Sequence, residues 1–167
     1  MKETFLNLQN KRHTVLNITD NVDYSNDHLQ AIINKTISLS PTAFNNKSVK
    51  TILLTDQHNI SFWKQVLTDK LISKREHSKK NDQISYQNLN FFSRGKGTIL
   101  FFTDDSVITE KQNYSDMFNW CEQNHAIAEY SVWLMLTELD LGASLQHCVF
   151  HLSKKCVKNS IYLRHGF

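Results

Sequence analysis

Three short stretches of this chain carry side chains that could hold a phosphate or a flat ring. The first, residues 12–14, reads Arg-His-Thr and combines a permanent cation, a titratable ring and a hydroxyl. An arginine offers a planar fork of donors that matches a phosphate monoester, and a threonine adds one donor more. Surface Arg-His pairs are also common without any ligand, so this stretch gains weight only together with the other two.

The second stretch, residues 40–47, reads Ser-Pro-Thr-Ala-Phe-Asn-Asn-Lys and holds the only proline of the 167 residues. A solvated turn would use more Gly and Asp, whereas this one presents a hydroxyl, an aromatic ring and the amides of Asn45 and Asn46. Side-chain amides both donate and accept hydrogen bonds, as the pyrimidine edge and the ribityl hydroxyls of a flavin require. Taken alone, the loop is better explained as structural.

The third stretch, residues 141–147, reads Leu-Gly-Ala-Ser-Leu-Gln-His. Because Gly142, Ala143 and Ser144 are small, the backbone could approach a flat ring closely. Its N–H groups could then bond N5 and O4 of a flavin. Hydride transfer would belong to the cofactor, while the protein would hold the ring and tune its electronics.

Other kinds of site are not favoured. The sequence has no glycine-rich phosphate loop, no dinucleotide-binding fingerprint and no C-x-x-C pair. His147 and His151 have i, i+4 spacing with Cys148 beside the first, but without a third ligand nearby we predict no metal site. Cys121 precedes His125 by one helical turn, yet its aromatic neighbour favours packing over a nucleophile–base pair.

Composition indicates one globular domain. With 40% hydrophobic residues and a formal net charge of +3, the chain can form a packed core. No apolar run reaches the roughly 20 residues that span a bilayer, and the N-terminus lacks the apolar stretch of a secretory signal. Three scattered cysteines argue for a reducing compartment. We expect a soluble, cytoplasmic protein with no membrane association.

The last twenty residues differ in charge from the rest. They hold four of the 19 basic residues, none of the 16 acidic ones, and two of the three cysteines. A basic tail can bind nucleic acid or phospholipid, but four charges without interleaved aromatic residues argue against a nucleic-acid partner. We divide the chain into a body, residues 1–147, and an atypical basic tail, residues 148–167.

Periodicity places the elements that must position these stretches. Apolar residues at helical spacing predict helices over 26–39, about 59–72 and 125–139, and β-branched or apolar runs predict strands over 49–55 and 97–103. The last helix is apolar on more than one face and is expected to be central, with Gly142 taking a positive φ where it stops. Helices alternating with strands predict an α+β domain with one small sheet.

Five segments then match a known pattern in register. Residues 12–14 stand for R-R-[TS], 40–45 for S-P-[ST]-A-F-N and 97–102 for G-T-[IV]-L-F-F, while 120–123 resemble W-S-E-Q. Residues 132–147 resemble V-W-x-x-L-x-E-L-G-L-G-A-x-L-Q-H. Over about residues 4–147 the chain thus resembles the nitroreductase superfamily, in the subgroup of the bacterial copper-induced nitroreductases and the yeast fatty-acid-repression oxidoreductases.

The resemblance implies a nitroreductase-like α+β fold, with a small mixed sheet flanked by helices. It further implies a homodimer that binds FMN at the dimer interface. NADH or NADPH would reduce the flavin, which would pass the electrons to a small aromatic acceptor, a nitroaromatic or a quinone, in a ping-pong cycle.

The resemblance also assigns three groups of site residues, none of which need act as an acid or a base. The phosphate and ribityl end of FMN would meet Arg12 and Thr14. The partner subunit would bring to the flavin ring Pro41, Thr42, Ala43 and Asn45. The N5 side of the ring would be lined by Leu145, Gln146 and His147.

Three departures from the pattern affect the prediction. His13 replaces a second arginine, which weakens phosphate binding because imidazole is mostly neutral at neutral pH. Lys47 replaces a glutamine, exchanging an amide for a cation beside the cofactor. After His147 the pattern stops, where relatives continue with a helix, a strand carrying a second phosphate clamp and an extension around the partner. We therefore expect the C-terminal strand and extension to be missing and a sheet edge to be unpaired.

A frameshift would explain the abrupt change at the tail. Permitted codons for residues 150–167, read one nucleotide later, can spell a segment that resembles the relatives' continuation, and the gene's nucleotide sequence tests this hypothesis. Two alternatives to an active enzyme stay open. The chain could be a truncated, catalytically impaired fragment that only dimerises or binds a flat ligand, or a binding module that acts through its basic tail.

Overall fold

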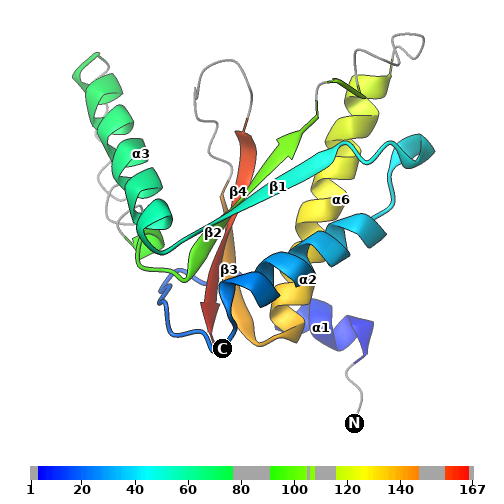
Figure 1. Ribbon diagram of the computed structural model, residues 1–167, viewed down its shortest axis with the longest axis horizontal. Helices are drawn as coiled ribbons and strands as arrows, with labels where there is room; N and C mark the ends of the chain where they lie inside the picture. Colours follow the sequence, from blue (N-terminus) through cyan, green and yellow to red (C-terminus); the bar gives the residue numbers. More distant parts are fainter. Residues whose placement is uncertain (1–3, 77–90, 105, 108–115, 147–156, 166–167) are drawn as a thin grey trace.

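A four-stranded sheet divides the helices into two groups. The structure, a computed structural model, describes residues 4–76, 91–104, 106–107, 116–146 and 157–165. Helices α1 (Phe5–Lys11), α2 (Asn26–Leu39) and α6 (Met117–Glu138) lie together on one side, and α3 (Asp56–Glu76) stands apart on the other (Figure 1). Among the described residues no helix is long and apolar enough to cross a membrane.

Helix α2 has the predicted bounds because its ends are marked by polar residues. The hydroxyl of Ser25 accepts a hydrogen bond from the backbone N–H of His28 at 3.2 Å and so caps the start of the helix. At the other end Pro41 cannot continue the helix. Leu29 and Ile33, one turn apart, are fully buried, so the predicted apolar face is the one that packs.

Helix α6 starts eight residues before the predicted position. Its buried stripe continues from Val132 back through Ala128 and His125 to Cys121 and Met117, at the three- and four-residue spacing of one helix face. The apolar spacing is hard to recognise over these first turns because the opposite face of the helix is exposed. The longer helix runs past the whole width of the sheet, so it can contact both the 40–47 loop and residues 12–14.

The predicted helix stop at Gly142 is wrong. Helix α6 ends at Glu138, and the left-handed residue that follows is Asp140, with φ 58°. Aspartate tolerates this region better than most residues, and Lys11 holds its carboxylate at 2.7 Å. Gly142 lies inside strand β3 (Leu141–Gln146), where a Cβ would come within 3.0 Å of Val15 Cγ2. Its small size serves packing on Val15.

All four strands pair antiparallel, in the order β1-β2-β4-β3. The predicted strands are found at β1 (Val49–Thr55) and β2 (Gly97–Thr103), which pair along their full length with Val49 opposite Thr103. Outside these strands the one isolated bridge described is parallel and joins Thr14 to Ala143. The α+β, nitroreductase-like fold class is confirmed, but the expectation of a mixed sheet is wrong, because the four described strands all pair antiparallel.

The expectation that the sheet lacks its C-terminal strand is wrong. Residues Val157–His165 of the basic tail form β4, which lies between β2 and β3 and pairs with both. Ile161 stands opposite Ile99 on one side and opposite Leu145 on the other. The expectation rests on the end of the family pattern at His147, whereas strand pairing needs only backbone groups and β-forming residues, which the tail has. The gap between β2 and β3 is therefore filled.

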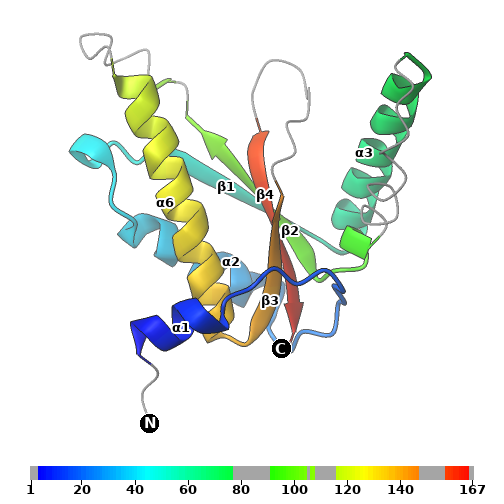
Figure 2. The ribbon, with the colours of Figure 1, turned by 180° about the vertical axis from the view of Figure 1, so that it is seen from behind.

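Figure 2 shows α2 and α6 on one side of the sheet and α3 on the other, and each group packs through an apolar cluster. The larger cluster joins α2 and α6 to the sheet through residues that include Leu29, Ile33, Phe101, Val132 and Leu136. The smaller cluster packs Trp63 and Val66 of α3 against Ile18 and Phe92. Trp63 Nε1 also donates a hydrogen bond to Thr98 Oγ1 on β2 at 3.0 Å, which joins α3 to the sheet.

We predict that Gly97→Ala destabilises the protein more than Gly142→Ala. A Cβ at position 97 would lie 2.5 Å from the backbone oxygen of Leu54, which cannot move without distorting β1, whereas the obstacle at position 142 is a side chain. The free energy of unfolding, measured with urea, should fall by about 2–3 kcal/mol for Gly97→Ala and by about 1 kcal/mol for Gly142→Ala. Val15→Ala should relieve only the second loss, and equal losses would contradict the packing described.

Candidate functional site

The bridge between Thr14 and Ala143 brings the first and third candidate stretches together. The backbone N–H of Val15 donates to the oxygen of Ala143 at 3.0 Å. Backbone groups of alternate residues in a strand point to the same edge, so the N–H and C=O of Leu145 face this edge beyond the bridge. A backbone donor of β3 therefore lies two residues beyond the position that pairs with the exposed Thr14.

Arg12 is positioned by an aromatic ring. It ends α1 as the C-cap, and its Cζ lies 4.4 Å from the centroid of the Trp133 ring on α6. Contact of a guanidinium with the face of a tryptophan ring is attractive and fixes the plane of the guanidinium group. His13 beside it is exposed, with Nδ1 3.0 Å from the oxygen of Lys11. Arg12 is thus a permanent cation whose orientation is set by Trp133.

Strand β3 differs from its predicted role in one respect. Ala143 and Ser144 are buried and Gly142 packs on Val15, so these three residues form part of the core. Leu145 and Gln146, which follow them, are half-buried. His147 lies outside the described residues, as do Cys148 and His151.

The 40–47 loop contains strained backbone. Phe44, Asn45 and Lys47 have φ angles of 52°, 53° and 53°, in the left-handed region that costs a residue with a side chain about 1–2 kcal/mol. Such strain persists only where surrounding contacts hold it. Phe44 is 62% exposed, and its ring lies 5.5 Å from that of Trp120.

A buried asparagine on α6 holds this loop. Asn124 is 4% exposed, and its Oδ1 accepts a hydrogen bond from the backbone N–H of Ala43 at 3.1 Å. Its Nδ2 donates to Asn46 Oδ1 at 3.2 Å and to Ser48 Oγ at 3.3 Å. Sequence analysis missed Asn124, although a polar residue inside the buried stripe of α6 was a usable signal. Asn46 therefore faces inward, and Asn45 is the exposed amide of the loop.

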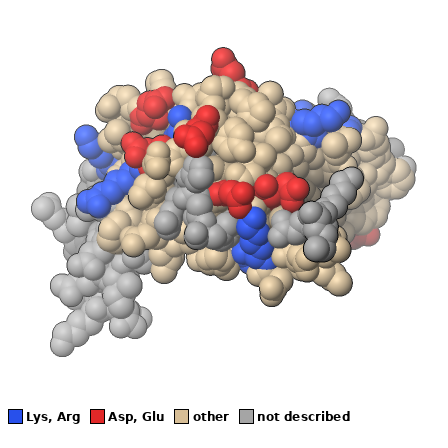
Figure 3. Space-filling model, turned by 90° about the horizontal axis from the view of Figure 1, so that it is seen from below, with Lys and Arg blue, Asp and Glu red and all other residues tan. Residues whose placement is uncertain are grey.

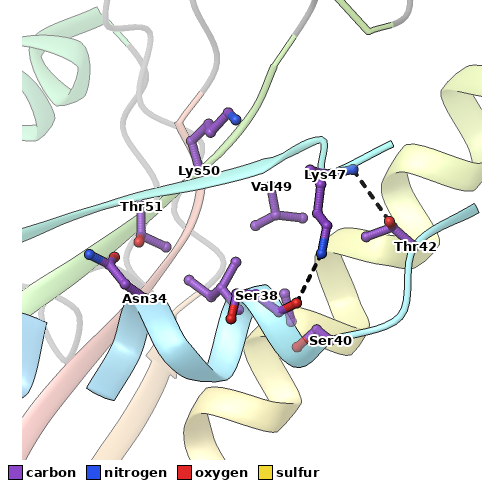
Figure 4. Close-up of a pocket in the computed structure, with 10 residues that line it drawn as sticks. Asn34, Ser38, Ser40, Thr42, Lys47, Val49, Lys50 and Thr51 are labelled. Atoms are coloured by element: carbon purple, nitrogen blue, oxygen red, sulfur yellow. Dashed lines mark hydrogen bonds between the residues drawn. The ribbon is translucent and has the colours of Figure 1, made fainter. Parts of the chain in front are cut away.

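Lys47 and Thr42 line a cavity of about 290 Å³ between the end of α2 and β1. The backbone N–H of Lys47 donates to Thr42 Oγ1 at 3.3 Å, and its Nζ donates to the oxygen of Ser38 at 3.0 Å. Figure 4 shows the Lys47 side chain running down toward Ser38, while Lys50 points away from it. Within a single chain, the Lys47 side chain thus caps the C-terminal end of α2.

Lys50 lies instead near the end of β2, with Nζ 3.9 Å from Asp104 Oδ2. The hydrogen bond from the Ser106 hydroxyl, at 2.6 Å, is the main cause that lowers the pKa of Asp104. Because the folded-state pKa lies below the unfolded one, this contribution to stability is present at neutral pH and is lost as the pH falls through the folded-state pKa.

Cys121 and His125 do not act together. Cys121 is fully buried, with Sγ 3.8 Å from Asn46 Nδ2. His125 has Nε2 3.0 Å from Glu129 Oε1, outside hydrogen-bond geometry, and Nδ1 3.2 Å from Thr103 Oγ1. Both side chains point into the packed side of α6, so the prediction of packing is confirmed.

One chain does not bring all three candidate stretches together. The 40–47 loop is anchored at Asn124, and Arg12 packs on Trp133, which lies about 14 Å further along α6 at 1.5 Å per residue. Figure 1 accordingly shows the loop and α1 at opposite ends of α6. Between these two contacts α6 exposes Ile127 (41%) and Tyr130 (38%), and its first turn exposes Phe118 (51%).

Comparison with known proteins identifies the family. Residues 10–162, which reach into β4, match the Nitroreductase family. The chain therefore belongs to that family. HBN1 of Saccharomyces cerevisiae, whose name assigns it to the nitroreductases, is 27% identical over 128 residues, which cover 71% of this chain and 60% of HBN1. The chain thus spans less than two thirds of that curated relative.

Two solved structures share the fold. Nitroreductase CinD from Lactococcus lactis, in complex with nicotinic acid, is 26% identical with a TM-score of 0.81, covering 97% of this chain and 89% of CinD. A nitroreductase from Saccharomyces cerevisiae is 16% identical with a TM-score of 0.79, covering 95% of this chain and 93% of that one.

We predict that Asn124→Ala loosens the 40–47 loop. It would leave the N–H of Ala43 and the Asn46 side chain without their buried partner, which costs about 2–4 kcal/mol in the free energy of unfolding. Urea denaturation measures this loss. Asn45→Gly is the matched control, because it removes an exposed amide and keeps the left-handed backbone allowed. A loss as small as that of Asn45→Gly would show that Asn124 does not hold the loop.

Proposed function

We propose that the chain is an FMN-dependent NAD(P)H oxidoreductase that reduces nitroaromatics or quinones. It works as a cytoplasmic homodimer with FMN between the two chains. The observation that carries this proposal is that α6 holds the candidate stretches apart within one chain. Residues 12–14 and β3 form one half of a site, the 40–47 loop forms the other, and a second chain can bring the halves together across the exposed face of α6.

The residues present fit FMN by the chemistry of their donors. The Arg12 guanidinium, oriented by Trp133, matches a phosphate. The exposed hydroxyl of Thr14 suits the phosphate or ribityl end, and the backbone N–H of Leu145, at the open edge of β3, suits an acceptor on the ring. Gln146 completes this side, where His13 adds a weaker donor, and the resemblance alone assigns His147, outside the described residues, to the same side.

The partner's loop covers the ring. Its strained backbone, held by Asn124, presents Pro41, Thr42, Ala43 and Asn45 in a fixed arrangement, and Lys47 lies at the end of the loop. Fixed donors avoid reorganisation when charge changes on the ring. When bound, FMN supplies the hydride transfer, and the residues of the chain bind it, orient it and limit the access of water.

The first test is the state of the purified protein. We expect a dimer that carries the absorbance of bound flavin and oxidises NADH or NADPH when a nitroaromatic or a quinone is added. Ile127→Glu should give monomers and release FMN together, because a charge on the exposed face of α6 opposes association. Ile52→Glu, at a 49% exposed apolar position on β1, is the control. A monomeric variant that keeps FMN would contradict an interface site.

We also predict that Arg12→Ala weakens FMN binding more than His13→Ala. Arg12 keeps its charge at every working pH and offers two parallel hydrogen bonds. A charge-assisted bond contributes about 1.5–3 kcal/mol, so a loss of about tenfold or more is expected for Arg12→Ala. Titration of the apoprotein with FMN, followed by flavin fluorescence, gives the affinities. Negligible effects of both changes would remove residues 12–14 from the site.

A further inference from the structure

Helix α1 is held against α6 without a buried side chain of its own. All seven of its residues, Phe5–Lys11, are described, and none of them is buried. The helix lies across the C-terminal part of α6 (Figure 2). A helix of this length is marginal in water by itself, so its position depends on the surface side chains that join it to α6.

Two polar contacts join α1 to this end of α6. Nε2 of Gln9 donates a hydrogen bond to the hydroxyl of Tyr130 at 2.9 Å, and Nζ of Lys11 lies 2.7 Å from Oδ1 of Asp140. Figure 3 views the molecule from below Figure 1, the end at which α1 lies, and shows acidic and basic side chains next to one another on that face. The Asp140 side chain is 63% exposed, so water screens the ion pair and keeps it weak.

The position of Arg12 depends on α1. Its backbone N–H donates to the oxygen of Leu8 at 3.0 Å as the C-cap of the helix, and its guanidinium lies over the ring of Trp133. The chain after Arg12 is held by the backbone hydrogen bond from Val15 to Ala143. The chain before it is held through the side chains of α1. Undocking of α1 would therefore take the guanidinium away from Trp133.

We propose that Gln9, Lys11 and Asp140 are positioning residues for a phosphate group at Arg12. Resting on the proposed function, the phosphate is that of FMN. Arg12 meets it in the right orientation only while α1 is docked on α6. The apparent affinity is the intrinsic affinity multiplied by the docked fraction. Loss of a docking contact thus lowers the affinity for the phosphate and leaves the affinity for the rest of the flavin unchanged.

The sign of the effect separates positioning from charge alone. Asp140 is an anion at the same end of α6 as Arg12, so its neutralisation would strengthen phosphate binding if only charge repulsion acted. Neutralisation weakens phosphate binding if Asp140 acts by holding Lys11. Asparagine tolerates the left-handed backbone that Asp140 has at φ 58°. Asp140→Asn therefore removes the charge and keeps the turn.

The test compares FMN with riboflavin, which lacks the phosphate, in fluorescence titrations of the full chain without bound flavin. We expect Asp140→Asn and Gln9→Met each to lower the FMN affinity about three- to fivefold and to leave the riboflavin affinity unchanged. Adding Asp140→Asn to Lys11→Met should cause no further loss, because the ion pair is already broken. Glu138→Gln, which removes an exposed charge two residues from Asp140, is the matched control and should not lower the FMN affinity.

Amide hydrogen exchange follows the docking of α1 without any turnover. In the ligand-free protein, exchange in Phe5–Lys11 should be faster in Asp140→Asn and Gln9→Met than in Glu138→Gln. Because coupling between binding and docking is reciprocal, FMN should slow exchange in α1, whereas riboflavin should not.

The outcomes distinguish this inference from the proposed function. An FMN affinity that rises or stays the same in Asp140→Asn would overturn the inference, as would equal losses for FMN and riboflavin, which would make the contacts merely structural. A chain that binds neither flavin would overturn the proposed function, and inorganic phosphate would then replace FMN as the probe. A phosphate affinity that falls in Asp140→Asn would support the inference, while an unchanged affinity or no phosphate binding would overturn it as well.

Discussion

The whole domain depends on the backbone pairing of β4. Strands β2 and β3 both pair with β4 and not with each other, so without it the sheet would separate into the β1-β2 pair and an isolated β3. The bridge from Thr14 to Ala143 depends on the position of β3. The position of Arg12, two residues before the bridge, depends on β3 in turn. The backbone hydrogen bonds of a basic, unusual segment therefore hold the phosphate end of the candidate site against the rest of the core.

Two buried asparagines each hold a loop in place, one on each side of the sheet. Asn124 fixes the strained 40–47 loop, and Asn59 fixes the 91–96 loop, in each case by bonding backbone groups that have no partner in a helix or strand. A buried amide is costly unless its donors and acceptors are used, so each asparagine is stable only when its loop is in place. This coupling gives both loops one conformation and leaves their outward side chains available.

Helix α6 keeps the two halves of the proposed FMN site apart within one chain. It is buried along one face from Met117 to Leu136, and it keeps its anchored loop at one end and Trp133 near the other. A helix packed in this way cannot bend to bring the two ends together. An exposed apolar face on a central helix is instead suited to a second copy of the same chain, which would turn the separation into a shared site.

The sequence by itself determined the elements whose signal is local. Helix α2, strands β1 and β2 and the family motifs follow from apolar spacing, capping residues and short patterns, all of which act within a few residues. The tertiary structure alone decided the rest. Strand β4 exists because β2 and β3 leave a gap of one strand, and α6 extends to Met117 because its first turns find a core to cover. Asn46 turns inward and Asn45 outward because Asn124, far along the chain, bonds only one of them, and no local pattern contains that contact.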